Sequence, residues 1–141
     1  MIFADTVYLF ALLSPDDQWH GQAAQISRTS QEPILTTGWV LMETGNGLAE
    51  TANRLMFAAF VRRFRTAQDV EVVPATMEWF DRGLKLYETR PDKEWSLTDC
   101  ISFLVMRERG VTDALTNDHH FEQAGFRILL KNKRFVIRES S

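Results

Sequence analysis

The sequence is almost without cysteine, since Cys100 is the only one among its 141 residues. A lone cysteine excludes an internal disulfide and is typical of proteins kept in a reducing compartment. Long apolar runs are missing too: no stretch reaches the length of a membrane span, and no charged segment followed by an apolar one marks a secretion signal. We therefore expect a cytoplasmic protein with no membrane association.

Histidine is also scarce, and the chain has no excess of positive charge. The only histidines are His20, His119 and His120, and no zinc-like spacing surrounds them. The net charge of −3 excludes a globally basic nucleic-acid-binding protein, but it leaves room for phosphates held by local basic patches or by a bound cation. With 45% apolar and 25% charged residues, the composition is that of one ordinary globular domain.

Short apolar segments alternate with helical ones along the chain. We expect strands at residues 2–5, 33–36, 70–73, 112–116 and 127–130, and helices at 6–13, about 14–28, 38–48, 51–65, 76–88, 96–109 and 119–124. This alternation predicts an α/β fold, a three-layer α/β/α sandwich around a mostly parallel sheet of about five strands. We expect a single domain over residues 1–130 and a polar C-terminal tail over 131–141.

Four carboxylates stand beside or within apolar segments: Asp5, Glu43, Asp99 and Asp118. Burial of an acid is costly unless the acid is paired, hydrogen-bonded, protonated or bound to a metal. Asp5 ends the first strand, and Asp118 comes just after the fourth. Glu43 and Asp99 lie in early turns of helices that begin at the same edge of the sheet. Since open parallel sheets bind ligands at the carboxyl ends of their strands, we expect the four acids to converge there.

Clustered carboxylates of this kind predict a site for a hard divalent cation. Oxygen ligands favour Mg²⁺ or Mn²⁺ over Zn²⁺. We expect all four acids to be catalytic metal ligands, with Asp5 and Asp99 as the main anchors. Glu43 and Asp118 would orient water or bind a second ion. The expected reaction is in-line hydrolysis of a phosphodiester, leaving a 5′-phosphate and a 3′-hydroxyl.

Further polar residues adjoin these acids. Thr6 and Thr116 are candidates to donate hydrogen bonds to the acids or to a scissile phosphate. The pair His119 and His120 suggests a metal-binding or general-base role, but local packing or hydrogen bonding is the more common function of such a residue.

Each acid also has a purely structural interpretation. Asp5 and Asp118 stand where they would cap the helices that follow them, and Ser96 with Asp99 forms a capping-box pattern. No helix-capping role fits Glu43. If Glu43 is purely structural, it lies on a solvent-exposed face of its helix. The sequence alone leaves these interpretations open.

The motifs around the acids carry a family resemblance. The matching pieces are Ile2-Phe3-Ala4-Asp5-Thr6, Glu43-Thr44, Ser96-Leu97-Thr98-Asp99-Cys100 and Leu115-Thr116-Asn117-Asp118-His119-His120-Phe121-Glu122-Gln123-Ala124-Gly125-Phe126. With them the chain resembles the PIN-domain nucleases, above all the small VapC-type toxins of bacterial toxin–antitoxin pairs. The resemblance implies a metal-dependent endoribonuclease that cuts RNA, forms a homodimer and is inhibited by a small antitoxin protein. In this resemblance, the acidic active-site positions of the family correspond to Asp5, Glu43, Asp99 and Asp118.

Two other functions remain as alternatives. One is a non-catalytic PIN-like module that binds RNA or a partner without cutting. The other is a receiver-like signalling domain, which also gathers acids at strand ends but needs a lysine at the end of a late strand, where this chain has none before Lys131. The helix around residues 55–64 is apolar nearly all round, from which we predict a partner surface for dimerisation or for an antitoxin segment.

Overall fold

Five short strands form one parallel sheet in the computed structural model, which describes residues 1–131. The strands are β1 (Ile2–Ala4), β2 (Ile34–Thr37), β3 (Val70–Val73), β4 (Asp113–Leu115) and β5 (Arg127–Ile128), in the spatial order β3-β2-β1-β4-β5. The central strand β1 pairs with β2 through Ile2 and Ile34 and with β4 through Phe3 and Ala114. Because all pairings of these five strands are parallel, the predicted α/β sheet is confirmed.

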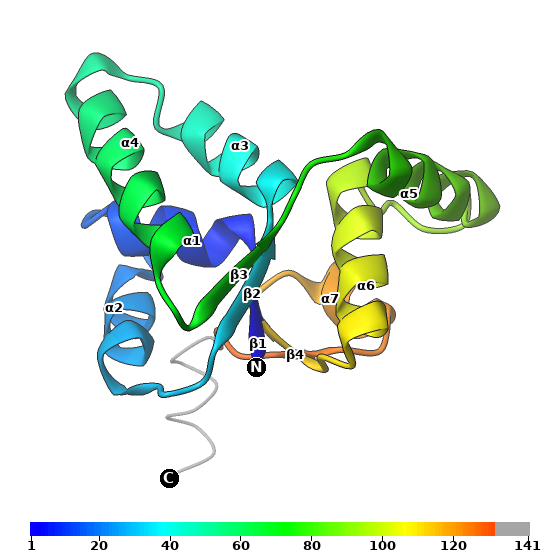
Figure 1. Cartoon of the computed structure of the whole chain (residues 1–141). Helices are drawn as coiled ribbons and strands as arrows, with labels where there is room; N and C mark the ends of the chain where they lie inside the picture. Colours follow the sequence, from blue (N-terminus) through cyan, green and yellow to red (C-terminus); the bar gives the residue numbers. More distant parts are fainter. Residues whose placement is uncertain (132–141) are drawn as a thin grey trace, which may run out of the picture.

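Seven helices in the described part cover both faces of the sheet (Figure 1). On one face lie α1 (Thr6–Leu13), α2 (His20–Thr29), α3 (Gly38–Gly47) and α4 (Thr51–Thr66). On the other lie α5 (Met77–Thr89), α6 (Leu97–Arg109) and α7 (His119–Gln123). None of these helices has both the length and the apolar character needed to cross a bilayer. The predicted tail lies, apart from Lys131, outside the described residues, and the domain boundary at residue 130 stays a prediction.

The winding of the chain reverses between β1 and β4. The first three strands step outward from β1 to β3, after which α5 and α6 carry the chain back across the sheet to β4 on the other side of β1. Neighbouring strands with helices on opposite faces leave a crevice at their carboxyl ends, which is where such sheets bind ligands. Receiver-type sheets have the order 2-1-3-4-5 instead, so the receiver-like alternative is wrong.

One helix begins later than predicted. Ser14, Pro15 and the acids after them do not open a helix, and α2 starts only at His20. Ser14 ends α1 by donating its backbone N–H to the Ala11 carbonyl, and the Asp17 carboxylate accepts a hydrogen bond of 2.8 Å from the backbone of Trp19. The proline and the acids therefore build a turn, a role for which these residues are equally suited.

An aromatic cluster joins α6 and α7 to the sheet. The Phe103 ring meets Trp95 and Phe121 edge to face, at centroid distances of 5.0 and 4.9 Å, and Phe121 approaches Phe3 of β1 at 6.2 Å. All four rings are buried. Large aromatic side chains contribute much of a core's burial energy, and edge-to-face contacts add to it. The cluster thereby fixes the first turns of α6 and α7 side by side, and two of the four acids lie there.

Candidate functional site

Asp5 is the most deeply placed acid of the site, directly after β1 and 6% exposed. Its carboxylate accepts a hydrogen bond of 2.9 Å from the Thr116 hydroxyl. Burial, with a smaller contribution from the charges of Asp99 and Asp118, raises the pKa of Asp5 to about 7 despite the hydrogen bond from Thr116, which lowers it. Although Asp5 stands at the N-cap position of α1, its side chain makes no capping hydrogen bond, so the capping interpretation does not account for it.

Asp99 lies in the first turn of α6 and forms the predicted capping box. Its Oδ2 accepts a hydrogen bond of 3.2 Å from the Ser96 backbone, and the Ser96 hydroxyl accepts one of 3.0 Å from the Asp99 backbone. Burial raises the pKa of Asp99, and the nearby Asp118 charge adds to the rise. Within residues 1–131 no group donates a hydrogen bond to Asp99 Oδ1. The cap therefore uses one lone pair of Oδ2, and both oxygens of this carboxylate keep a lone pair for a ligand.

Asp118 comes between β4 and α7 and is partly exposed. Its Oδ1 accepts a hydrogen bond of 2.9 Å from the backbone of His120, which is the predicted cap of α7. The Asp118 backbone in turn donates to the Thr116 hydroxyl at 3.1 Å. Thr116 thus contacts both Asp5 and the Asp118 main chain, and it holds the ends of β1 and β4 together.

Glu43 reaches the site through a second threonine. The Thr6 hydroxyl donates a hydrogen bond of 2.8 Å to Glu43 Oε1, and Thr6 is the direct neighbour of Asp5. In the part of the chain that the structure describes, no hydrogen bond or ion pair joins Glu43 to the other three acids. The structure therefore brings Asp5, Asp99 and Asp118 into mutual electrostatic contact and places Glu43 beside them, on α3.

His120 is the site residue whose position the sequence did not reveal. Its ring Nδ1 lies 3.4 Å from Asp99 Oδ2 and 3.4 Å from Asp118 Oδ1, and its side chain is only 22% exposed. His119 is much more exposed, at 70% of its side chain, and its Nδ1 lies 3.9 Å from Asp118 Oδ1. Asp118, His119 and His120 each offer a ligand atom within 4.8 Å of the others, so both histidines stand close enough to Asp118 to share an ion with it. The sequence places His120 near Asp118, but only the packing of α6 against α7 brings it to Asp99.

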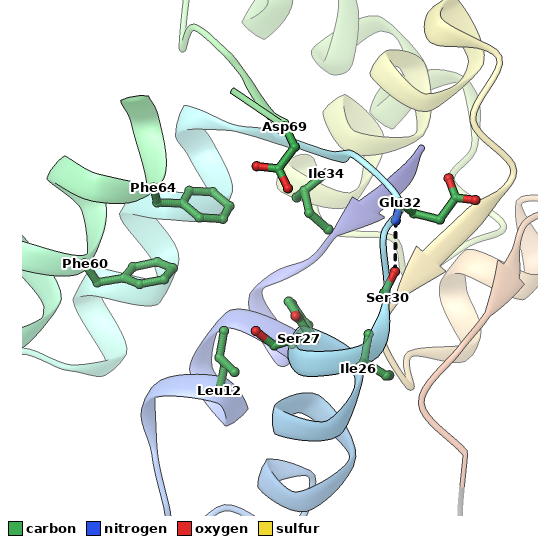
Figure 2. A pocket seen from close by; sticks show the side chains of 10 residues that line it. Leu12, Ile26, Ser27, Ser30, Glu32, Ile34, Phe60, Phe64 and Asp69 are labelled. Carbon is green, nitrogen blue, oxygen red and sulfur yellow. Dashed lines mark hydrogen bonds between the residues drawn. The ribbon is translucent and has the colours of Figure 1, made fainter. Parts of the chain in front are cut away.

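A separate cavity lies at the other end of the sheet from these acids (Figure 2). It has a volume of about 170 Å³ and is lined by α1, α2, β2 and α4, with Phe60 and Phe64 of α4 on one side and Glu32 and Asp69 at the rim. Ile34, the first residue of β2, contributes to the lining. The cavity is therefore at the amino ends of the strands, and none of the four acids lines it.

Comparison with known proteins agrees with this geometry. The family model described as the PIN domain matches residues 2–127. Over 127 residues the chain is 33% identical to the 23S rRNA-specific endonuclease VapC20 of Mycobacterium tuberculosis, and the match covers 89% of this chain and 95% of that relative.

Solved structures share the fold. The crystal structure of M. tuberculosis VapC20, described as a sarcin–ricin loop cleaving toxin, matches with a TM-score of 0.82 and 27% identity over 93% of this chain and 100% of that one. FitAcB of Neisseria gonorrhoeae (TM-score 0.62, 16% identity) and a toxin–antitoxin complex from Klebsiella pneumoniae (TM-score 0.64, 12% identity) each match over 92% of this chain and 96% of theirs. On the family model and the VapC20 match together, the chain belongs to the PIN-domain family, among its VapC-type members.

Proposed function

We propose that this protein is a divalent-cation-dependent endoribonuclease and the toxin of a type II toxin–antitoxin pair. The observation that carries the proposal is the meeting of Asp5, Asp99 and Asp118 at the switch point of the sheet, where burial and like charge raise the pKa values of Asp5 and Asp99. Burying several carboxylates side by side costs free energy. Such clusters are therefore typical of sites that bind a cation or transfer a proton.

The donor atoms fit Mg²⁺ or Mn²⁺, which take oxygen ligands. Asp5, Asp99 and Asp118 are the residues that would hold the ion. When bound, such an ion supplies positive charge to a scissile phosphate and makes a water easier to deprotonate. Thr116 keeps the Asp5 carboxylate in place, and Thr6 does the same for Glu43, which is then available to orient a water or to accept its proton.

The purified protein is expected to cut RNA with Mn²⁺ or Mg²⁺, to stop when EDTA is in excess and to resume when the ion is restored. Because VapC20 is described as cleaving the sarcin–ricin loop of 23S rRNA, an RNA fragment containing that loop is the first substrate to test, with a shuffled fragment of equal length as control. Products should carry 5′-phosphates. Cutting that EDTA leaves undiminished would contradict the proposal, and ion uptake without any cutting would favour the binding-only alternative.

We further propose that a homodimer forms through the exposed face of α3 and α4. Leu55 is 83% exposed and Met56 39% exposed on α4, while Met42 on α3 is 54% exposed. Large apolar side chains left in water are typical of an interaction surface. Phe60 and Phe64, on the same apolar helix, do not belong to this surface, because both rings pack against the core.

Leu55→Lys is expected to convert the dimer to a monomer, because it places a charge in the middle of that apolar face. Light scattering should give wild-type protein twice the chain mass of 16.3 kDa and the variant one chain mass. Met77→Lys, which changes an apolar side chain that is 66% exposed on α5, is the matched control and should stay dimeric. A monomeric wild type, or a dimer that Leu55→Lys leaves intact, contradicts this interface.

A small antitoxin and a cytoplasmic location complete the proposal. A nuclease that cuts cellular RNA needs an inhibitor in the cell that makes it, and the structural neighbours include a toxin–antitoxin complex. Cys100 is buried, and burial raises the pKa of its thiol to about 11, so it is an inert thiol suited to a reducing compartment.

A further inference from the structure

His120 is placed to bind the cation together with the acids. We propose that its Nδ1 is a nitrogen ligand of that cation and that it makes the centre prefer Mn²⁺, a transition-metal ion, over Mg²⁺. This inference rests on the proposed function, because it takes for granted a cation at the acids. It adds a ligand of a different chemical kind, on α7, to an otherwise all-oxygen set.

The spacing of the imidazole from the two acids suits a shared ion better than a hydrogen bond. Nδ1 is equally far, 3.4 Å, from Asp99 Oδ2 and from Asp118 Oδ1. A good N–H···O hydrogen bond has its heavy atoms about 2.9 Å apart, so the ring is bonded well to neither acid. Two ligand atoms that each stand about 2.1 Å from one ion are separated by about 3 Å or slightly more, close to the spacing seen here.

Backbone contacts hold His120 in this position. Its N–H donates to Asp118 Oδ1, and the Phe121 ring that follows it is fully buried in the aromatic cluster. The ring of His120 is thereby confined between the first turns of α6 and α7. Within the described residues no ion pair joins His119 to Asp99, and His119 is largely exposed, but it lies close to Asp118 and His120. The test must therefore separate the two histidines.

Ligand chemistry gives His120 a predictable effect on ion choice. Imidazole nitrogen binds transition-metal ions well, whereas Mg²⁺ favours oxygen ligands and gives up its waters reluctantly. Loss of the nitrogen should therefore weaken Mn²⁺ binding far more than Mg²⁺ binding. A residue that merely supported the fold would change both affinities alike or neither.

Pulsed electron paramagnetic resonance of the Mn²⁺-loaded full-length protein tests the inference directly. Wild type should show modulation from one directly bound ¹⁴N, and protein grown on ¹⁵N-labelled histidine should show the ¹⁵N frequency instead. His120→Asn should lose the nitrogen signal, and His119→Asn should keep it. A signal that persists in His120→Asn, or one that only His119 controls, overturns the inference; the labelled wild type gives an answer even if a variant folds poorly.

Calorimetric titration with each ion alone provides the second measurement. We expect His120→Asn to raise the Kd for Mn²⁺ about tenfold or more and the Kd for Mg²⁺ less than about threefold. Mn²⁺ bound by wild type without any nitrogen signal overturns the role of His120 and leaves the proposed nuclease intact. Failure of wild type to take up either ion would contradict the proposed function itself.

Discussion

Replacement of Asp5 by asparagine is expected to lower the rate of RNA cleavage about a thousandfold or more while the protein keeps its fold. An ion that neutralises charge on a phosphate is worth several kcal/mol in the transition state, and about 4 kcal/mol corresponds to a thousandfold in rate. Asparagine has nearly the volume of aspartate, and its amide oxygen can still accept the hydrogen bond from Thr116. The charge that holds the ion is the one property that changes.

The measurement is single-turnover cleavage of the loop-containing RNA, with circular dichroism to verify the fold. Asp16→Asn is the matched control, since it is the same substitution at an exposed position in the turn before α2, and it should cut like wild type. If folded Asp5→Asn cuts at the wild-type rate, Asp5 has no part in catalysis. Both variants are purified by the same procedure. A contaminating ribonuclease would then appear in both preparations, whereas the activity of the protein itself would be lost only in Asp5→Asn.

The same substitution is expected to stabilise the metal-free protein at neutral and higher pH. In the unfolded chain Asp5 ionises near its ordinary pKa of 3.8, but in the folded protein it holds its proton until about pH 7. Between these values the unfolded state binds fewer protons, so the free energy of unfolding falls as pH rises. A difference of about three pKa units corresponds to a loss on the order of 4 kcal/mol, complete above about pH 7. Asparagine carries no such penalty.

Chemical denaturation of both proteins in EDTA at pH 4 and pH 8 measures this effect. The stability of Asp5→Asn minus that of wild type should be small at pH 4 and large at pH 8; this difference cancels the titration of unrelated groups. Excess Mn²⁺ at pH 8 should then raise the stability of wild type and leave Asp5→Asn nearly unchanged, because ion binding to the folded state compensates the buried charge. A stability difference that does not change with pH would show that Asp5 ionises normally.

Topology explains why the sequence was informative about the acids. Short apolar segments that alternate with helices predict parallel strands, and parallel strands end at one edge, so residues that follow different strands meet there. Asp5 and Asp118 could be placed by this rule without knowledge of any contact. The predicted hydrogen bonds from Thr6 and Thr116 to acids are present, whereas the catalytic roles of these residues stay a proposal.

Two features depended on information that local sequence does not carry. The predicted start of α2 was wrong because proline and aspartate favour helix starts and turns alike. Only the hydrogen bond from the Trp19 backbone to Asp17 identifies this segment as a turn. The position of His120 beside Asp99 arises from the packing of Phe103 against Phe121, two residues on different helices. Spacing along the chain does not reveal such a contact.

The hydrogen bond from Thr116 to Asp5 has a consequence for the synthesis of this protein. Its partners are separated by 111 positions, and β4 lies beside β1 only after most of the chain has emerged. A growing chain that has not yet reached residue 116 lacks both Asp118 and the hydroxyl that positions Asp5. The carboxylate site is therefore completed only late in synthesis, once residues 116–118 have joined the folded part of the chain.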